Sequence, residues 1–411
     1  MLIQSSFSDL EYASKGYVTR RDRLLRDLDA LTPWPALLAT VEPVYPKGEG
    51  RGRPPIGLEK MLRMYIAQQC LGLSDEGIED ALYDSHAVRR FVGMDLARDT
   101  APDATTLLRF RRLLKPPSAP VLGVPPDLAL IHGDNPQPKV TWVGHATLLV
   151  QVDGVNLLTD PHWGRRASPL SFAGPKRHQD PGIPYEKLPA IHAVVISHNH
   201  WDHLDRDTVQ ALLDAHPGVR FYVPLGLQHW FKKEIRGVVI EGEARNVIAM
   251  DWDQKVSLKG KTQVLDLHFL AVQHWSARSL GDRYETLWGS WAIIHPDLRF
   301  WFSGDLGYSP DTRDIGERMG GFDLAAIAIG AYEPRWFMQD SHLNPQEALQ
   351  VMREVKAKHA IGIHWGTFEG ISDEPIDQAP KDLEMAKSNS SVPMDFFVLK
   401  HGQTWVKPSS K

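Results

Sequence analysis

Hydrophobic residues in the first 115 positions recur with the spacing of α-helices. Over residues 57–70, apolar side chains stand at positions 58, 61, 62, 65, 66 and 70, which we assign to one helix face. Ser74, followed by Asp75 and Glu76, predicts a second helix start, and a third helical run extends from Asp103 to Leu114. Strand patterns are scarce in this region, so we predict a small all-α segment over residues 1–115.

A proline-rich stretch follows the helical region. Proline neither continues a helix nor pairs inside a sheet. Five prolines lie within eleven residues, at positions 116, 117, 120, 125 and 126. The stretch therefore predicts an extended linker over residues 116–138.

From Lys139 onward, the pattern changes to the period of two that is typical of β-strands. Residues 140–143, 147–152 and 155–159 predict strands, and the Asp153-Gly154 turn between the last two indicates a hairpin. Helical runs at 208–215 and 345–357 interleave with further strand candidates at 193–196, 221–223, 264–270, 291–294, 300–302 and 360–363. This order predicts an α/β fold over residues 139–400, with two mixed β-sheets and outer helices.

Bulk composition agrees with two soluble domains. The chain has 411 residues, which exceeds what one hydrophobic core usually organises, and its formal charge of −5 argues against a whole-chain nucleic-acid binder. Cys70 is the only cysteine, which excludes an internal disulfide, and we expect it to be buried. No apolar run reaches the roughly 18 residues of a membrane span, and the N-terminus lacks a signal-peptide core, so we expect a cytoplasmic protein.

Histidines concentrate in the second half of the chain. Of 18 histidines, only His86 precedes residue 130. His198, His200, Asp202 and His203 stand within six positions, directly after the apolar strand at 193–196. Imidazole and carboxylate groups are suitable ligands for zinc. A turn of this kind can supply ligands to two neighbouring metal ions. We therefore favour a metal site here over a solvated polar loop.

Three further polar residues follow predicted strands in the same way. They are His274 after residues 264–270, Asp305 after residues 300–302, and His364 after residues 360–363. A single histidine after a strand is more often structural than ligating. Their shared position at strand ends makes them candidates to complete the metal site.

Several short motifs around these residues resemble one family. The HxHxDH motif resembles the metallo-β-lactamase superfamily, whose fold is an αββα sandwich. Flanking motifs over roughly residues 138–385 look like N-acylphosphatidylethanolamine-hydrolysing phospholipase D and its bacterial relatives. These motifs begin at Thr141 (TWVGHAT), Leu158 (LTDP), Ala167 (ASP), Gly174 (GPKR), Gln273 (QHW) and Ile329 (IGAYEPRWFM).

The resemblance implies a ligand set and a reaction. In that family, positions matching His198, His200 and His274 bind one zinc ion, those matching Asp202, His203 and His364 bind the other, and Asp305 bridges. The implied activity is phosphodiester hydrolysis of N-acylphosphatidylethanolamine-like lipids by a metal-bridging hydroxide, with catalytic roles for Asp202, Asp305 and His342. His342 matches a position near the substrate phosphate, although a structural role at a helix start is an equal alternative.

Other residues carry weaker expectations. Asp160 follows a strand and is expected to accept a hydrogen bond from a ligand histidine, or else to cap its turn. Lys176, Arg177 and Arg335 are weak candidates for an anionic head group, since exposed cations are usually solvated. Leu306 stands where family members commonly carry threonine beside the bridging aspartate.

The helical region resembles the N-terminal part of DDE transposases of bacterial insertion sequences. The resemblance rests on Gly52–Arg63, Leu73–Glu76 and Asp103–Leu114, and it stops at about Lys115. Lysine and arginine number 17 against 16 aspartates and glutamates through Lys115, so we do not expect DNA binding. The run Arg51–Pro54 is similar to a minor-groove hook, but a basic loop before a helix is preferred.

Two classes of function stay open. The first is a zinc hydrolase, either of phospholipase D type or acting on another ester, lactone or phosphodiester. The second is an inactive fusion whose N-terminal fragment once bound DNA. Peripheral contact with the inner membrane and a homodimer also stay open.

Overall fold

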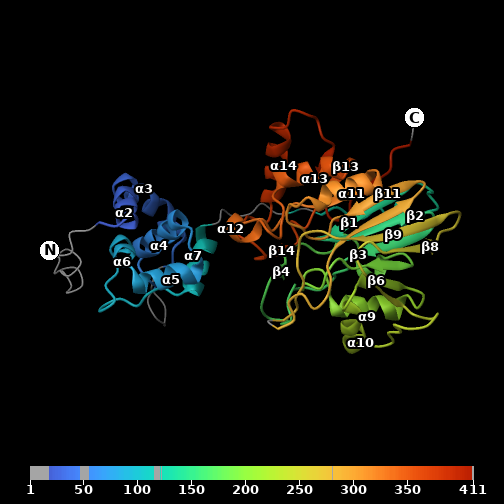
Figure 1. Ribbon diagram of the computed structural model, residues 1–411, viewed down its shortest axis with the longest axis horizontal. Coiled ribbons are helices and arrows are strands. Elements are labelled where there is room, and N and C mark those ends of the chain that lie inside the picture. Colours follow the sequence, from blue (N-terminus) through green and yellow to red (C-terminus); the bar gives the residue numbers. More distant parts are fainter. Residues whose placement is uncertain (1–17, 47–54, 115–120, 122, 280, 410–411) are drawn as a thin grey trace. The chain divides into compact units, whose positions relative to one another are not determined.

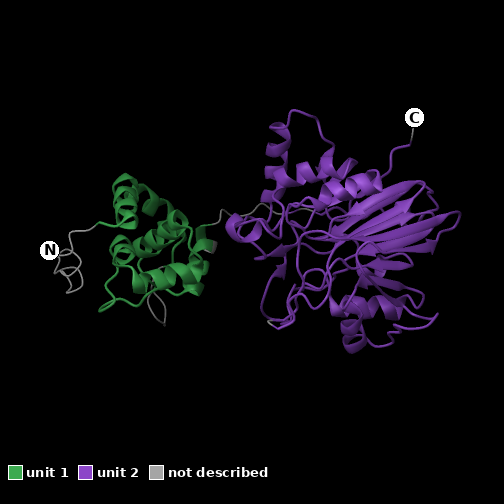
Figure 2. Cartoon of the chain, in the orientation of Figure 1, with its two compact units in different colours: residues 1–117 green, residues 118–411 purple. Residues whose placement is uncertain are grey.

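The computed structural model describes residues 18–46, 55–114, 121, 123–279 and 281–409. The chain divides into two compact units, residues 1–117 and 118–411 (Figure 2). None of the helices among the described residues is both long and apolar enough to cross a membrane.

The first unit is built from helices around one core (Figure 1). Ser74 caps the predicted second helix start by accepting a hydrogen bond from the Gly77 N–H at 2.9 Å. The run Arg51–Pro54 lies outside the described residues. The helices are α2 (Arg20–Leu31), α3 (Trp34–Val41), α4 (Leu58–Leu71), α5 (Asp75–Asp84), α6 (His86–Val92) and α7 (Ala104–Leu114), with a 3₁₀ turn at Glu42–Val44.

The expectation that Cys70 is buried is wrong. The buried side chains of α4 are Met61, Leu62, Met64, Ala67 and Gln68, whereas Cys70 is exposed. An α-helix turns about 100° per residue, so position 70 lies opposite position 61. The hydrogen bond of 2.6 Å from Gln68 to Asp75 keeps the 61/64/68 face towards α5.

The stretch predicted as an extended linker contains a short helix among its described residues. Residues Leu128–His132 form α8, which Asp127 caps through a 2.9 Å hydrogen bond from the Leu130 N–H. Ile131 is buried in the second unit's core. No proline stands between positions 127 and 135, so nothing there prevents a helix, and the prediction of an extended segment is wrong for Leu128–His132.

The second unit contains two seven-stranded sheets packed face to face. The first has the order β16-β1-β2-β3-β5-β6-β7 and the second β15-β13-β12-β11-β10-β9-β8. Strands of the first sheet are β1 (Lys139–Gly144), β2 (Thr147–Val152), β3 (Val155–Thr159), β5 (Ala193–Val195), β6 (Arg220–Pro224), β7 (Val247–Met250) and β16 (Thr404–Val406). Those of the second are β8 (Lys255–Lys259), β9 (Val264–Leu270), β10 (Ser290–His295), β11 (Leu298–Phe302), β12 (Phe322–Ala328), β13 (Ala357–Ile363) and β15 (Phe396–Val398).

Helices cover the outer faces of both sheets. α9 (Arg206–Ala215) and α10 (Leu227–Glu234) share a core with the first sheet, whereas α11 (Asp311–Met319), α13 (Pro345–Glu354) and α14 (Gln378–Ser388) pack on the second (Figure 1). Between the sheets, Trp142, Leu148 and Val150 meet Phe269, Trp291 and Phe300. The predicted αββα sandwich, preceded by an all-α segment, is confirmed.

Three short elements lie outside these layers. A two-stranded sheet pairs β4 (Lys176–Arg177) with β14 (Phe368–Glu369), and α12 spans Arg335–Met338. A 3₁₀ turn covers Tyr185–Lys187. Phe368 of β14 contacts the ring of His145, which occupies the turn between β1 and β2.

Candidate metal centre

Strand direction explains why distant polar residues meet. In the second sheet, β11 runs parallel to β12 and β13, and β9 has the same direction because both β9 and β11 pair antiparallel with β10. His274, Asp305 and His364 therefore follow strands that end at one edge. The loop after β5 brings His198–His203 to the same place, where ring and carboxylate atoms form close groups.

The first group consists of His198, His200, His274 and Asp305. Nδ1 of His200 lies 2.8 Å from Nε2 of His198 and 3.3 Å from Nε2 of His274. Oδ2 of Asp305 lies 3.8 Å from Nε2 of both His198 and His274. The group thus has the members that the sequence interpretation assigned to one metal.

The second group adjoins the first through Asp305. Nε2 of His203 lies 3.1 Å from Oδ2 of Asp305, and Nε2 of His364 lies 3.2 Å from Oδ1. Oδ2 of Asp202 is 3.2 Å from Nε2 of His364 and 3.5 Å from Nε2 of His203. Asp305 therefore lies between two sets of nitrogen donors.

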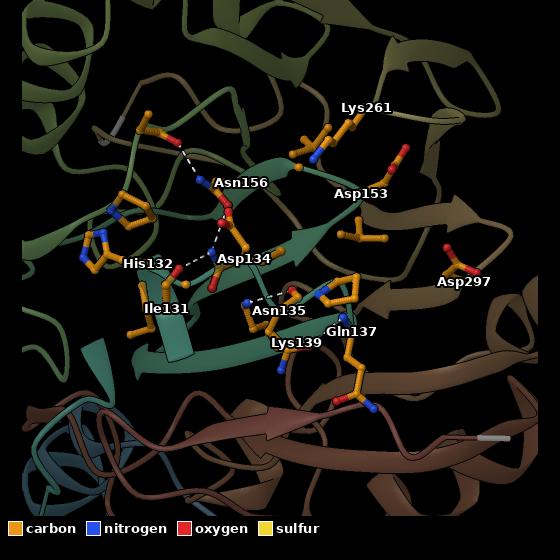
Figure 3. A pocket seen from close by; sticks show the side chains of 18 of the residues that line it. Ile131, His132, Asp134, Asn135, Gln137, Lys139, Asp153, Asn156, Lys261 and Asp297 are labelled. Carbon is orange, nitrogen blue, oxygen red and sulfur yellow. Dashed lines mark hydrogen bonds between the residues drawn. The ribbon is translucent and has the colours of Figure 1, made fainter. Parts of the chain in front are cut away.

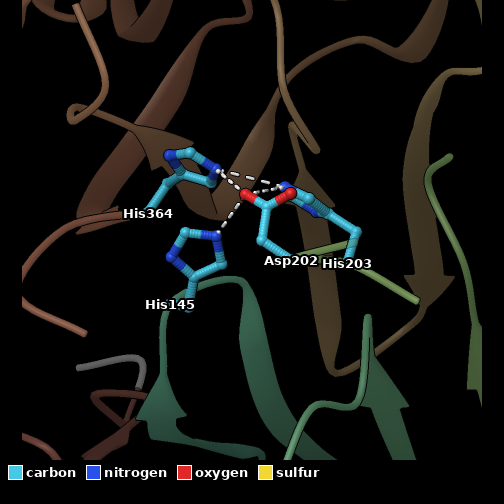
Figure 4. Close-up of side chains that lie close together, drawn as sticks. All are labelled: His145, Asp202, His203 and His364. Carbon is cyan, nitrogen blue, oxygen red and sulfur yellow. Dashed lines mark hydrogen bonds and ion pairs between the residues drawn. The ribbon is translucent and has the colours of Figure 1, made fainter. Parts of the chain in front are cut away.

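His145 also belongs to the second group, which the sequence analysis does not predict (Figure 4). It occupies the turn between β1 and β2, and its Nε2 lies 2.9 Å from Oδ2 of Asp202. The only sequence signal is its position in the TWVGHAT motif, directly after a predicted strand.

Asp160 contacts His203 on the ring nitrogen that faces away from Asp202 and Asp305. Its Oδ2 lies 2.7 Å from Nδ1 of His203, and it also accepts hydrogen bonds from the Ser197 hydroxyl at 2.5 Å and the Ser197 N–H at 2.7 Å. The expected hydrogen bond to a histidine of the cluster is thus present. It orients His203 with Nε2 towards Asp202 and Asp305.

His342 lies at the rim of the two groups. Its Nδ1 is 3.9 Å from Oδ2 of Asp305, and its side chain is 12 % exposed. Arg335 fixes this segment by donating to the His342 carbonyl at 2.8 Å and to both oxygens of Glu347 at 3.0 Å. Arg335 is therefore occupied within the protein.

The remaining basic candidates differ from each other. Arg177 donates to the carbonyls of His162 at 2.7 Å and Gly164 at 2.8 Å, and its guanidinium lies over Phe368. Lys176 is exposed.

Leu306, where relatives were expected to carry threonine, is fully buried in the core that includes α11 and α13.

Burial and charge set the protonation of the cluster. Burial lowers the pKa of His198 and His274 well below the usual range, and that of His200 and His342 to about 4. Burial opposes ionisation of Asp305, but the charges of His203 and His364 and their hydrogen bonds hold its pKa well below the usual range. The carboxylates of Asp305 and Asp202 outweigh burial and raise the pKa of His203 well above its usual range and that of His364 to about 9. Neutral imidazole and ionised carboxylate are the forms that bind metal ions, so metal binding would displace the protons of these two histidines.

The donor set fits divalent metal ions. In the first group, nitrogen atoms of neutral imidazoles face one another at hydrogen-bond distance. Each neutral imidazole has one nitrogen without a proton, whose lone pair can bind a metal ion. Imidazole nitrogens and carboxylate oxygens are common ligands of divalent transition metals. His198, His200, His274, Asp202, His203, His364 and Asp305 would hold such ions.

A separate cavity lies away from this centre (Figure 3). It has a volume of about 580 Å³ and includes the Asp153-Gly154 turn, at the opposite end of β2 and β3 from His145 and Asp160. Lys139 and Lys261 share its lining with Asp153 and Asp297, so its charges are mixed. The clustered histidines do not line it.

Comparisons with known proteins agree with the geometry. Residues 155–365 match the family described as the beta-lactamase superfamily domain, and residues 14–113 match a transposase domain, DUF772. An isothiocyanate hydrolase from Delia radicum gut bacteria shares the fold, with a TM-score of 0.51 at 17% identity, covering 66% of this chain and 100% of that chain.

Two curated relatives share more of the sequence. The N-acyl-phosphatidylethanolamine-hydrolyzing phospholipase D 1 of Caenorhabditis elegans is 41% identical over 64% of this chain and 74% of its own length. The mitochondrial enzyme of that name from Saccharomyces cerevisiae is 30% identical over 60% of this chain and 51% of its own length. The chain therefore belongs to the β-lactamase superfamily of metal-dependent hydrolases, as a homologue of these phospholipases D that carries a transposase-type domain at its N-terminus.

Proposed function

We propose that the second unit is a binuclear zinc phosphodiesterase of phospholipase D type, acting on N-acylphosphatidylethanolamine-like lipids. The observation that carries this proposal is the position of Asp305 between two groups of histidines. Zinc–nitrogen bonds of 2.0–2.1 Å in a tetrahedral site separate ligand atoms by about 3.3 Å. The 2.8 and 3.3 Å contacts of His200 with His198 and His274 are close to that separation.

Two zinc ions bound here would supply an activated water and offset negative charge on the attacked phosphate. The side chains have distinct tasks in this scheme. Asp305 would fix the spacing of the two sites, and Asp202 would complete the second. His342, at the rim, would hydrogen-bond the phosphate or pass a proton to the departing alcohol oxygen.

The substrate class is supported by the relatives and by the surface near His342. Both curated relatives are named for hydrolysis of N-acyl-phosphatidylethanolamine. On α12, shortly before His342, Trp336 and Phe337 are 51% and 66% exposed. Exposed aromatic side chains on the helix that precedes His342 suit a lipid substrate and a peripheral contact with membranes.

The proposal is tested with the full-length chain loaded with zinc and incubated with vesicles containing N-acylphosphatidylethanolamine. We expect phosphatidic acid and N-acylethanolamine as products, because a D-type enzyme breaks the bond between phosphorus and the head-group oxygen. His200→Ala should abolish their release. His359→Ala is the control, since His359 pairs with Asp395 outside the cluster.

The same assay separates the alternatives. Cleavage of bis(p-nitrophenyl) phosphate without cleavage of the lipid would indicate a different phosphodiester substrate. A wild-type chain without bound metal, together with unchanged activity in His200→Ala, would contradict the proposal. A metal-loaded chain that cleaves neither substrate would indicate an inactive fusion.

A further inference from the structure

His145 is placed unlike the other histidines of the centre. It is 2% exposed and sits in the turn between β1 and β2 at a φ of 52°, a left-handed conformation that is unfavourable for a residue with a side chain. A strained backbone that persists in a buried turn needs compensating contacts. The contacts of His145 run to two members of the second group.

The backbone of His145 is bonded on both sides. Its N–H donates to Oγ1 of Thr367 at 2.7 Å, and its carbonyl accepts from the His364 N–H at 3.0 Å and from Nε1 of Trp142 at 3.0 Å. The turn of the first sheet is thereby joined to the residues that follow β13 in the second sheet. His364 keeps its position partly through this link.

The side chain of His145 contacts the same oxygen of Asp202 as the two other histidines of the second group. His203 and His364 lie within 3.5 Å of Asp202 and within 3.2 Å of Asp305. His145 shares only the first of these contacts: its Nε2 is 2.9 Å from Oδ2 of Asp202, and it forms no ion pair with Asp305 in the described structure. It therefore belongs to the outer side of the second group.

We propose that His145 is a positioning residue of the second metal site, whose Nε2–H orients the Asp202 carboxylate while its carbonyl holds the backbone of His364. This inference rests on the metal centre of the proposed function. Hydrogen-bond donors behind a ligand carboxylate restrict its rotation, and removing such partners typically weakens metal binding roughly 10- to 100-fold. The first group does not contact His145, so the effect should be confined to one of two ions.

The test compares zinc binding by the full-length metal-free protein and its variants in competition with a chromophoric chelator. His145→Leu removes the donor and keeps a side chain of similar bulk, whereas His145→Gln retains an N–H donor. We expect wild type to bind two ions. His145→Leu should keep one site at wild-type affinity and weaken the other roughly 10- to 100-fold, and His145→Gln should recover part of the loss.

His295→Leu is the matched control. His295 is also buried, and its Nε2 lies 3.4 Å from Oδ2 of Asp153, at the end of β10 remote from the centre. It should bind two ions like wild type. Unchanged affinity for both ions in His145→Leu, or an equal loss in His295→Leu, would overturn the positioning role. If His145→Leu does not fold, the comparison of His145→Gln with wild type makes the same test with a smaller expected shift.

Cobalt substitution distinguishes positioning from direct ligation. At saturating cobalt, a positioning role predicts that His145→Leu regains the visible absorption bands of wild type, because the ligand set is intact. Altered bands at saturation would show that His145 is itself a ligand and would overturn the proposal. Since metal binding is the readout, this result is independent of substrate: site-selective weakening with no lipase activity would support His145 and contradict the proposed function.

Discussion

Buried charge in the first unit is arranged differently from that in the histidine cluster of the second unit. In the first unit, the side chain of Asp22 is fully buried and pairs with Arg26 at 2.8 Å and with Arg90, and Asp75 pairs with Arg111 at 2.8 Å. In the second unit, imidazole nitrogens face each other at 2.8 and 3.1 Å around shared carboxylates. Opposite charges in a pair offset each other, whereas imidazole nitrogens that converge around shared carboxylates form a set of ligands suited to metal ions.

The second unit also contains complete pairs away from its centre. Asp323 is bonded by Lys358 at 2.8 Å and Lys407 at 2.7 Å, and Arg335 by Glu347 at 3.0 Å. The convergence of imidazole nitrogens is therefore confined to one edge of the sheets and is not a property of the whole unit. This contrast identifies the site independently of any motif.

The strongest test of the contrast is Asp305→Asn. The substitution removes the carboxylate that contacts both groups, so we expect loss of metal from both sites and a fall in lipid hydrolysis of roughly a thousand-fold or more, corresponding to several kcal/mol. Metal content by mass spectrometry and product release measure the two effects. Asp323→Asn, which alters the ion pairs with Lys358 and Lys407, should keep both metal ions. Retained metal and activity in Asp305→Asn would invalidate the contrast.

The members of the centre could be predicted from sequence to the extent that they follow strands. His274, Asp305 and His364 stand directly after apolar runs, and the ends of parallel strands lie at one edge. His145 also follows a predicted strand, at residues 140–143, but it stands alone in a short turn far from the HxHxDH motif, and a lone histidine has no spacing signal. Its contact with Asp202 depends on how the two sheets pack.

Parts of the fold were beyond the sequence patterns for similar reasons. β12 is buried along all of Phe322–Ala328, so its residues show no alternation of polar and apolar positions. β8 alternates but is mostly charged or polar, with exposed Lys255 and Lys259 at its ends. The pattern of apolar residues in α4 did not identify the exposed face of the helix, because several of these residues are only partly buried. In each case, the pattern of buried residues depends on tertiary packing, which the local sequence does not contain.

Removing a complete pair from the first unit should affect stability and leave metal binding unchanged. Asp22→Ala leaves Arg26 and Arg90 without their shared carboxylate, and we expect a loss of about 2 kcal/mol in the stability of the helical unit, since both guanidinium groups are partly exposed and regain water. Hydrogen exchange in α2 and α6 measures it. Asp27→Ala, an exposed change on the same helix, is the control. Loss of zinc in Asp22→Ala would show that this pair is not purely structural.

His401 represents a buried histidine with an ordinary partner. Its Nε2 lies 2.9 Å from Oγ1 of Thr367, its ring stacks on Trp142, and burial lowers its pKa from 6.5 to about 3. Below pH 6.5 the unfolded chain binds a proton that the folded chain does not, so stability falls as the pH decreases. His401→Gln should reduce this fall by an amount that grows to about 1.4 kcal/mol per pH unit as the pH decreases from 6.5 to 5.

Urea unfolding of wild type and His401→Gln at several pH values measures this difference. Only the difference between the two proteins is informative, because the histidines of the centre titrate in both. Equal slopes would mean that His401 is protonated in the folded chain. A changed zinc content in the variant would place His401 among the residues that support the centre.

The smallest expected effect concerns DNA. Residues 1–115 carry 17 basic against 16 acidic side chains, and several basic groups of the described helices are already engaged. Arg63 pairs with Asp29 at 2.7 Å and Glu59 at 2.8 Å, Lys60 with Asp99 at 2.6 Å, and Arg111 with Asp75 at 2.8 Å. Because affinity for DNA depends on cations that can neutralise phosphates, we expect no retardation of insertion-sequence ends by the full-length chain, even at low salt. A retarded complex whose affinity falls steeply with added salt would mean that free cations outside these pairs form a binding surface, and that the transposase-type domain keeps a function of its own.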